Sequence, residues 1–164
     1  PPPGPGGYPP APGYPAPPGP AGYPGGPVAA PPSPVEVDPH RLGPNMGRLS
    51  STAKKLAKAP VAVTAAMLAE GEIVECLIQG RVNGADGVAV LTNTRLLLVS
   101  SREWKPEVIE LPVDAQLAVQ GWQDNRTAAL VMQRADQQAT IDLVGDRPLA
   151  MELAQRIRAR SALG

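Results

Sequence analysis

The fold is decided by residues 88–100, which read VAVLTNTRLLLVS. Two apolar, β-rich runs flank a short polar break, Thr92-Asn93-Thr94-Arg95, and this pattern predicts a tight β-hairpin. Asn tolerates left-handed backbone angles at a turn, and its side chain can bond the nearby backbone. We expect this hairpin to form the centre of an antiparallel sheet. Nothing in it suggests a catalytic role.

Short strands with frequent turns surround the hairpin. Before it, Val74, Cys76 and Ile78 alternate onto one face of a strand, and residues 80–87, with three glycines, predict a loop. After it we expect four further strands, at 108–111, at 117–122, around Leu130 and Met132, and around Ile141 and Leu143. Trp122, at the end of a strand, is expected in the core. Seven short antiparallel strands predict a mainly β protein, built as a small barrel or sandwich.

A helix is predicted after the last strand. Asp146 is a suitable N-cap, and Pro148 falls in the first turn, where its missing N–H is tolerated. Leu149, Leu153 and Ile157 recur every four residues and form one apolar stripe. We expect this C-terminal helix to cap one open end of the barrel. Burial of the large apolar side chains would contribute about 1.5 to 3 kcal/mol each.

The segment before the sheet, residues 41–70, has a helical pattern. A serine or threonine at 50–52 could cap a short basic helix that ends at Lys58. Pro60 suits the first turn of a second helix, over 61–69. We therefore expect one or two helices before the barrel. The predicted domains are a leader at 1–40, a helical segment at 41–70 and the barrel with its C-terminal helix at 71–164.

Residues 1–35 carry no charged side chain and consist mostly of Pro, Gly, Ala and Tyr. Such a segment has too few large apolar groups to offset the entropy of ordering it, so we expect a disordered N-terminal leader. Gly-Tyr-Pro triplets recur at Tyr8, Tyr14 and Tyr23. These tyrosines could be stickers that recruit partners or drive weak self-association, or the leader could be a soluble tether.

Charge is balanced overall but unevenly distributed. The chain has 15 basic and 15 acidic residues, so no net charge attracts nucleic acid. Residues 36–58 and 147–160 each have a net charge of +3, and residues 59–146 have a net charge of −6. We expect two basic helices that flank an acidic body, and that either complement it or face an acidic partner.

The chain has one cysteine and one histidine, and these low counts exclude several kinds of site. Cys76 is the only cysteine, which excludes an internal disulfide, and without a His partner it is expected to be a small buried side chain. His40, the only histidine, is expected to be a solvated linker residue. A lone thiol is typical of a reducing compartment, and no apolar run reaches the roughly 18 to 20 residues of a membrane span. We predict a cytoplasmic protein without catalytic residues, cofactor or metal.

The ordered set of motifs resembles the bacterial pleckstrin-homology-like domains. It comprises a Gly-Glu pair at 71–72, a Thr-x-x-Arg-Leu hairpin at 92–96, and a Leu-containing strand that leads into an acidic turn at Asp114. These features are similar to the YokE-like, GRAM-related members, and the resemblance covers residues 60–162. It implies a seven-stranded antiparallel barrel or sandwich capped by a C-terminal helix.

The resemblance also implies a non-catalytic scaffold or binding domain. Related eukaryotic domains bind phosphoinositides through basic residues around the first inter-strand loop. Here that loop, predicted at 80–87, holds one Arg offset by Asp86. A polyphosphate headgroup needs several charge-assisted donors, so we do not expect tight inositol phosphate binding.

Two hypotheses for function stay open. The first is an adaptor or scaffold that binds protein and self-associates through edge strands suited to strand addition. The alternative is a peripheral module at the inner face of the membrane, in which Lys54, Lys55 and Lys58 contact anionic lipid. Trp104, in a polar loop, is a candidate anchor for a partner or a membrane, or it could fold back over the barrel.

Overall fold

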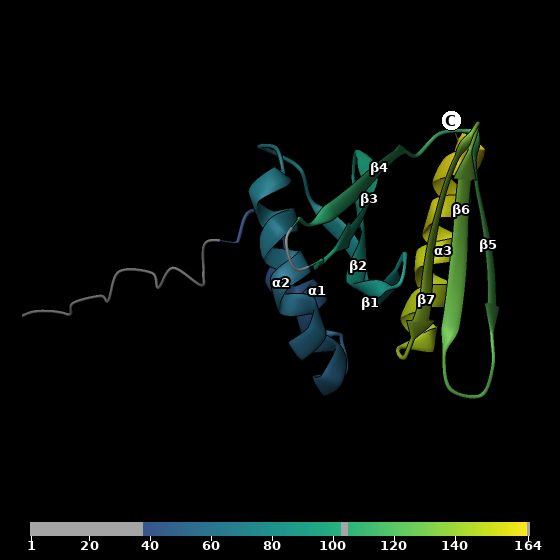
Figure 1. Ribbon diagram of the computed structural model, residues 1–164. Helices are drawn as coiled ribbons and strands as arrows, with labels where there is room; N and C mark the ends of the chain where they lie inside the picture. The colour runs from purple at the N-terminus through teal and green to yellow at the C-terminus, as the bar shows by residue number, and fades with distance from the viewer. Residues whose placement is uncertain (1–37, 103–104, 164) are drawn as a thin grey trace, which may run out of the picture. The chain divides into compact units, whose positions relative to one another are not determined.

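The computed structural model describes residues 38–102 and 105–163. From Pro39 onward the described residues form one compact unit, whose elements are labelled in Figure 1. Within the described residues, α1 (Leu42–Gly47) and α2 (Ser51–Met67) precede seven strands and a final helix, α3 (Arg147–Leu163). The strands are β1 (Val74–Val82), β2 (Ala85–Thr92), β3 (Arg95–Ser100), β4 (Glu107–Pro112), β5 (Leu117–Gln123), β6 (Ala128–Arg134) and β7 (Gln137–Val144).

The seven described strands pair into one antiparallel sheet, in the order β4-β3-β2-β1-β7-β6-β5. The β2–β3 hairpin lies inside the sheet, as the sequence predicts, with Leu91 opposite Leu96 next to the turn. The end of β1 joins the two parts of the sheet, because Arg81 and Val82 pair with β7. This arrangement of strands, followed by one helix, is the predicted pleckstrin-homology layout, and the predicted fold class is confirmed.

The connection between β1 and β2 is shorter than the loop predicted at 80–87. The two strands run on to a two-residue turn, Asn83-Gly84, in which both residues have positive φ. Asn-Gly is a preferred sequence for such a turn. Gly80 and Gly87 lie inside the strands, where an added Cβ would sit 2.5 Å from a backbone oxygen of a neighbouring strand. The loop prediction was wrong because these glycines allow close strand approach rather than a turn.

Helix α2 is continuous, whereas the sequence suggested two helices separated near Pro60. Ser50 caps it by accepting a hydrogen bond from the Ala53 backbone N–H at 3.3 Å. Pro60 removes one backbone donor from the helix interior. The helix nevertheless continues, since its buried face of small residues packs on β1, β2 and β3. The buried positions are Ala53, Ala57, Pro60 and Thr64.

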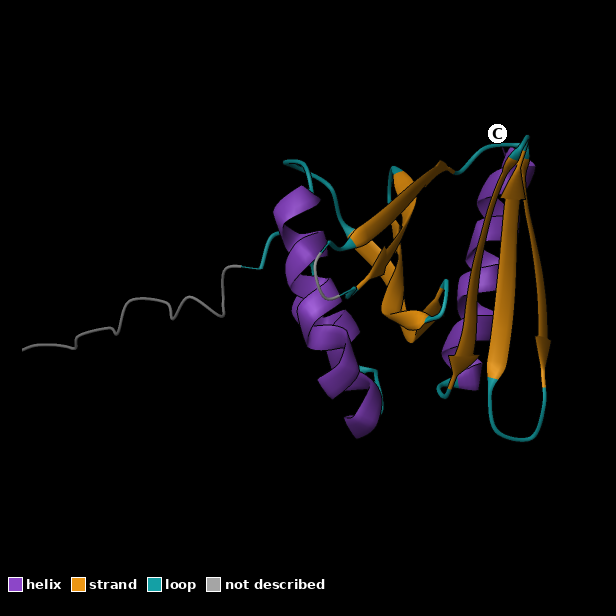
Figure 2. Ribbon diagram, in the orientation of Figure 1, coloured by secondary structure: helices purple, strands orange, loops and turns teal. Residues whose placement is uncertain are grey.

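The C-terminal helix α3 contacts β1, β5 and β6. Figure 2 shows it as the helix beside the strands of the second part of the sheet. Leu149, Leu153 and Ile157 are buried, as the apolar stripe predicts. They join a core of Val, Leu and Ile side chains from the strands. The carboxylate of Asp146 accepts a hydrogen bond from the Ser50 backbone N–H at 3.2 Å. The start of α3 is thereby tied to the start of α2.

Candidate functional site

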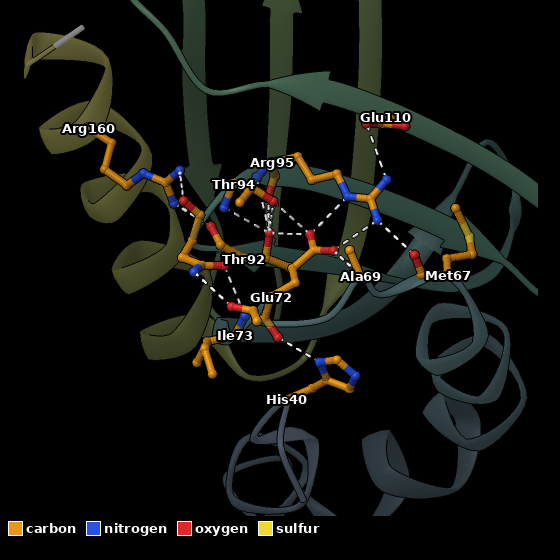
Figure 3. Close-up of polar contacts among 12 residues, drawn as sticks. His40, Met67, Ala69, Glu72, Ile73, Thr92, Thr94, Arg95, Glu110 and Arg160 are labelled. Atoms are coloured by element: carbon orange, nitrogen blue, oxygen red, sulfur yellow. Dashed lines mark hydrogen bonds and ion pairs between the residues drawn. The ribbon is translucent and has the colours of Figure 1, made fainter.

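Glu72 is the centre of a buried polar network (Figure 3). Its side chain is 2% exposed and accepts two hydrogen bonds from Arg95, from Nε to Oε2 at 2.8 Å and from Nη2 to Oε1 at 2.9 Å. The hydroxyls of Thr92 and Thr94 donate to Oε2 at 2.7 and 2.9 Å. The Ala69 backbone N–H donates to Oε1 at 3.0 Å. Both carboxylate oxygens are therefore held by the hairpin and by the chain that follows α2.

The network keeps both charges in place. Hydrogen bonds from Arg95, the main cause, lower the pKa of Glu72 to about 2, although burial acts in the opposite direction. Arg95 also donates from Nη2 to the Met67 carbonyl at 2.8 Å, and its Nη1 pairs with Glu110 of β4 at 3.2 Å. We call Glu72, Arg95, Thr92 and Thr94 the clamp, because they join the end of α2, the hairpin and β4. A carboxylate engaged in this way offers no proton to a substrate.

The clamp is made of the residues that carry the family resemblance. Glu72 belongs to the Gly-Glu pair, and Thr92 and Arg95 are the polar positions of the Thr-x-x-Arg motif. The sequence identified them as a signature of the fold but did not predict that they touch. A signal was present for Arg95, since an Arg at the start of an apolar β run must be paired if it is buried.

His40 is not the solvated linker residue that the sequence predicts. It is half-buried, and its Nδ1 donates to the Glu72 carbonyl at 2.6 Å. Its own carbonyl accepts from the Val74 backbone N–H at 2.8 Å. The prediction failed because the chain before α1 lies along the start of β1. A carbonyl oxygen only accepts, so Nδ1 carries the proton in this arrangement.

Cys76 is fully buried, as predicted. Burial raises the pKa of its thiol to about 11, and the thiol approaches the Leu149 carbonyl at 3.9 Å. It is therefore a small, neutral core side chain. Across residues 38–102 and 105–163, no group of three or more His, Cys, Asp or Glu side chains could hold a metal ion.

The predicted lipid-contacting lysines lie on the solvent side of α2. Lys54, Lys55 and Lys58 are all exposed, and Leu56, between them in sequence, is 39% exposed. One helix thus presents three ammonium groups and an apolar side chain. The other predicted site residues lie outside the described part of the chain; they are Tyr8, Tyr14, Tyr23 and Trp104.

The two terminal strands of the sheet differ in the protection of their free edges. Strand β4 carries two glutamates and ends in Pro112, which discourage pairing with another strand. Strand β5 reads LAVQGWQ and has neither a charged residue nor a proline. Arg158 covers its first half by donating to the Val119 carbonyl at 3.3 Å. Its second half, residues 121–123, is exposed.

Trp122 is 57% exposed, which contradicts the prediction that it lies in the core. Along β5, the inward position after Val119 is Gly121, where an added Cβ would sit 2.7 Å from Leu130 Cδ2. The alternation of the strand therefore turns Trp122 to the outer face, opposite Ala129 of β6. The core has no room for a side chain at position 121, and Trp122 is left outside it.

Leu143 adds a second exposed apolar side chain to this face. The β6–β7 register shifts so that Ile141 stays opposite Leu130 in the core, while Leu143, with a φ of 54°, is 53% exposed. A regular strand would put Leu143 on the same face as Ile141, and the bulge reverses it. Trp122, Ala129 and Leu143 line a shallow pocket of about 190 Å³. We call these three residues the β5 patch.

Comparison with solved structures finds a similarity to a pleckstrin homology domain from Shewanella amazonensis SB2B. The identity is 20% and the TM-score is 0.42, over 63% of this chain and 96% of that one. No protein-family model matches the chain. No curated protein matches it either. In the described part of the chain, no helix has the length and apolar character needed to cross a membrane.

Proposed function

We propose that this chain is a non-enzymatic adaptor or scaffold domain that binds protein and associates with a second copy of itself. We further infer that it is a cytoplasmic member of the bacterial PH-like, YokE-like and GRAM-related group. The observation that carries the proposal is the exposed, uncharged second half of β5 beside the β5 patch. The fold class by itself is compatible with binding either a protein or a lipid.

Strand addition is the mode of association that this edge favours. An exposed terminal strand presents unpaired N–H and C=O groups, and a second strand satisfies them. Two β5 strands can pair antiparallel about a two-fold axis, which makes the contact self-complementary. Neither strand carries a charge that would be repelled by its copy. Trp122 lies on the outer face next to this edge, and aromatic side chains of this kind often dominate binding energy.

The test is the molar mass of the full chain, measured by size-exclusion chromatography with light scattering over a range of concentrations. We expect the mass to rise from monomer to dimer with concentration. Trp122→Ser and Gln123→Lys should shift it toward the monomer. Val108→Ser is the matched control, because Val108 is 37% exposed on the opposite terminal strand, and its mass profile should not change. A monomer at every concentration would contradict the proposal.

The alternative function is peripheral membrane binding, which the exposure of Lys54, Lys55, Lys58 and Leu56 favours. Each lysine near an anionic surface contributes about 1 kcal/mol, and an apolar side chain can supply a second attachment signal. Flotation with anionic vesicles should then weaken with salt and with Lys→Glu changes on α2. The control is Arg126→Glu, at the β5–β6 turn. Equal loss in the control would leave no role for α2.

The leader and the domain division are part of the same proposal. We propose a helical segment at 41–70, a barrel at 71–164, and a leader whose Tyr8, Tyr14 and Tyr23 add weak contacts. Serine at all three positions should lower the apparent mass at high concentration and leave the effect of Trp122→Ser unchanged. If the mass does not respond, the leader is a tether.

A further inference from the structure

A pocket lined by arginines lies where α1, the start of β1 and α3 meet. Its volume is about 370 Å³, at the lower end of the roughly 300–1,000 Å³ of small-ligand sites. Three of its lining residues are Arg41, Arg48 and Arg156. The side chains come from before α1, from after α1 and from α3, so the fold brings together positive charges that are far apart in sequence. All three belong to the two segments of the sequence that have a net charge of +3.

Arg48 and Arg156 share a single carboxylate. Glu152 accepts from Arg48 at 2.9 and 2.5 Å and from Arg156 at 3.0 Å. Both arginine side chains are 45% exposed, and both line the pocket. The pKa of Glu152 is lowered to about 2, mainly by the hydrogen bonds from Arg48 and to a smaller extent by the one from Arg156. One negative charge therefore faces two positive charges.

Hydrogen bonds from a buried asparagine side chain position the backbone of Arg41. Asn45, 8% exposed, donates from Nδ2 to the Arg41 carbonyl at 2.8 Å and to the Val74 carbonyl at 3.1 Å. These bonds hold Arg41 at a φ of 62°, a conformation that is uncommon for a residue with a side chain. Among residues 38–102 and 105–163, no carboxylate lies within salt-bridge distance of its guanidinium. The strained backbone thus places a charged side chain, without a described ionic partner, at the pocket.

One acidic residue also lines the pocket. Glu75 is paired with Arg160 of α3 at 3.4 Å, so its charge is partly compensated. With Glu152 and Arg160 included, the cluster contains four arginines and two glutamates, a net charge of +2. A ligand with two negative charges would balance it.

We propose that this pocket binds a phosphate group. A guanidinium offers a planar pair of N–H donors that matches phosphate oxygens, and Arg41, Arg48 and Arg156 present three such groups around one cavity. A phosphate dianion also matches the net charge of the cluster. The site lies at the start of β1, whereas the β1–β2 turn at Asn83 lies at the end of that strand. It does not depend on self-association through β5.

The first test is titration of the full-length, ¹⁵N-labelled protein with inorganic phosphate and with pyrophosphate, followed by NMR at constant ionic strength. We expect saturable shifts at Arg41, Asn45 and Arg48. Arg41→Asn should weaken binding roughly tenfold, because it removes one set of charge-assisted hydrogen bonds. Asn is chosen because it tolerates positive φ, so the backbone is retained. The control is Arg126→Asn, which removes the same charge at the β5–β6 turn and should bind normally.

A second variant has the opposite expected effect. Glu152→Gln removes the carboxylate that holds Arg48 and Arg156, and it should tighten phosphate binding several-fold. A structural role for these residues would not produce tighter binding. The proposal is overturned if neither phosphate nor pyrophosphate gives saturable shifts, or if Arg41→Asn and its control bind equally well.

The source of the phosphate is tested separately, with vesicles that contain phosphatidic acid against vesicles of phosphatidylcholine alone. If the protein floats with the phosphatidic acid vesicles, and both pyrophosphate and Arg41→Asn weaken this binding, the ligand is a lipid headgroup. Shifts with free phosphate in the absence of flotation identify a soluble phosphate compound. If the protein floats but neither pyrophosphate nor Arg41→Asn changes the flotation, and free phosphate gives no NMR shifts, the proposal is overturned. The contact with the vesicle is then α2.

Discussion

The hairpin side of the sheet and the β5–β7 side treat polar and apolar residues in opposite ways. On the hairpin side, Glu72 and Arg95 are charged and would draw attention as a site, but they are turned inward and satisfied. On the other side, Trp122 and Leu143 are apolar and would be placed in a core, but they are 57% and 53% exposed. In this fold, residue type alone does not separate buried positions from exposed ones.

Backbone geometry explains the difference between the two sides. The hairpin is regular, and the residues that follow its turn, 96–99, are all fully buried. The β5–β7 part has a register shift next to Leu143 and a glycine at the last inward position of β5, Gly121. Each irregularity moves one apolar side chain from the core to the surface. If the clamp stabilises the fold and the β5 patch does not, substitutions in the two should differ in their effect on the free energy of unfolding.

Breaking the clamp from one side should have the largest effect. Arg95→Met leaves the carboxylate of Glu72, 2% exposed, without its charged partner, and should lower the free energy of unfolding by about 3–5 kcal/mol. The measurement is urea unfolding at neutral pH. Arg102→Met, which removes one partner of an exposed pair, should lose less than about 1 kcal/mol. Equal losses in the two variants would mean that the clamp is no more than a surface ion pair.

The clamp should also make stability depend on pH. The pKa of Glu72 is about 2 in the folded protein against an ordinary value of 4.5, so the unfolded state binds more protons between these values. Its contribution is complete above pH 4.5 and is lost as the pH falls toward 2, by at most about 3 kcal/mol. Urea unfolding at several pH values between 2 and 4.5 should show that the free energy of unfolding depends less steeply on pH in Glu72→Gln than in the unchanged protein. The remaining slope comes from carboxylates such as Glu152, whose pKa is also about 2.

Close strand packing should have a smaller effect than the clamp. In Gly87→Ala, the new Cβ would sit 2.5 Å from the Val99 carbonyl oxygen, so the β2–β3 backbone must shift. We expect the free energy of unfolding to fall by about 1–3 kcal/mol, as for other overpacked sites. Gly145→Ala is the control, because its Cβ would meet nothing within 4 Å. An unchanged Gly87→Ala variant would mean that this pairing is looser than its register indicates.

The sequence was sufficient for elements whose pattern is local and regular. The hairpin at 88–100, the apolar stripe of α3 and the seven strands follow from alternation, turn residues and a period of four. The fold class could therefore be predicted. The polar partners of Glu72 could not, because a pairing across some 20 residues leaves no periodic trace; only the pairing requirement of a buried charge pointed to it.

The failures of prediction share a physical cause. The loop predicted at 80–87, the break at Pro60 and the core position of Trp122 each depend on what packs against the residue, not on the residue itself. Gly80 is in a strand because β7 approaches it, and Pro60 stays in a helix because its face is buried. The arginine pocket was missed for the same reason, since its side chains come from three separate segments.

The smallest effect on stability should come from the β5 patch, and this makes it the sharpest test of the comparison. Trp122→Ser removes the largest side chain of the patch. It should nevertheless change the free energy of unfolding by no more than about 0.5 kcal/mol. The measurement belongs at low protein concentration, where association does not add to stability. Leu130→Ala, beneath the same strands and fully buried, should lose about 2–5 kcal/mol. If Trp122→Ser lost as much as Leu130→Ala, the tryptophan would be part of the core, and an association defect in that variant would reflect unfolding rather than a lost contact. A small loss together with a shift to the monomer would instead separate binding from folding at one residue.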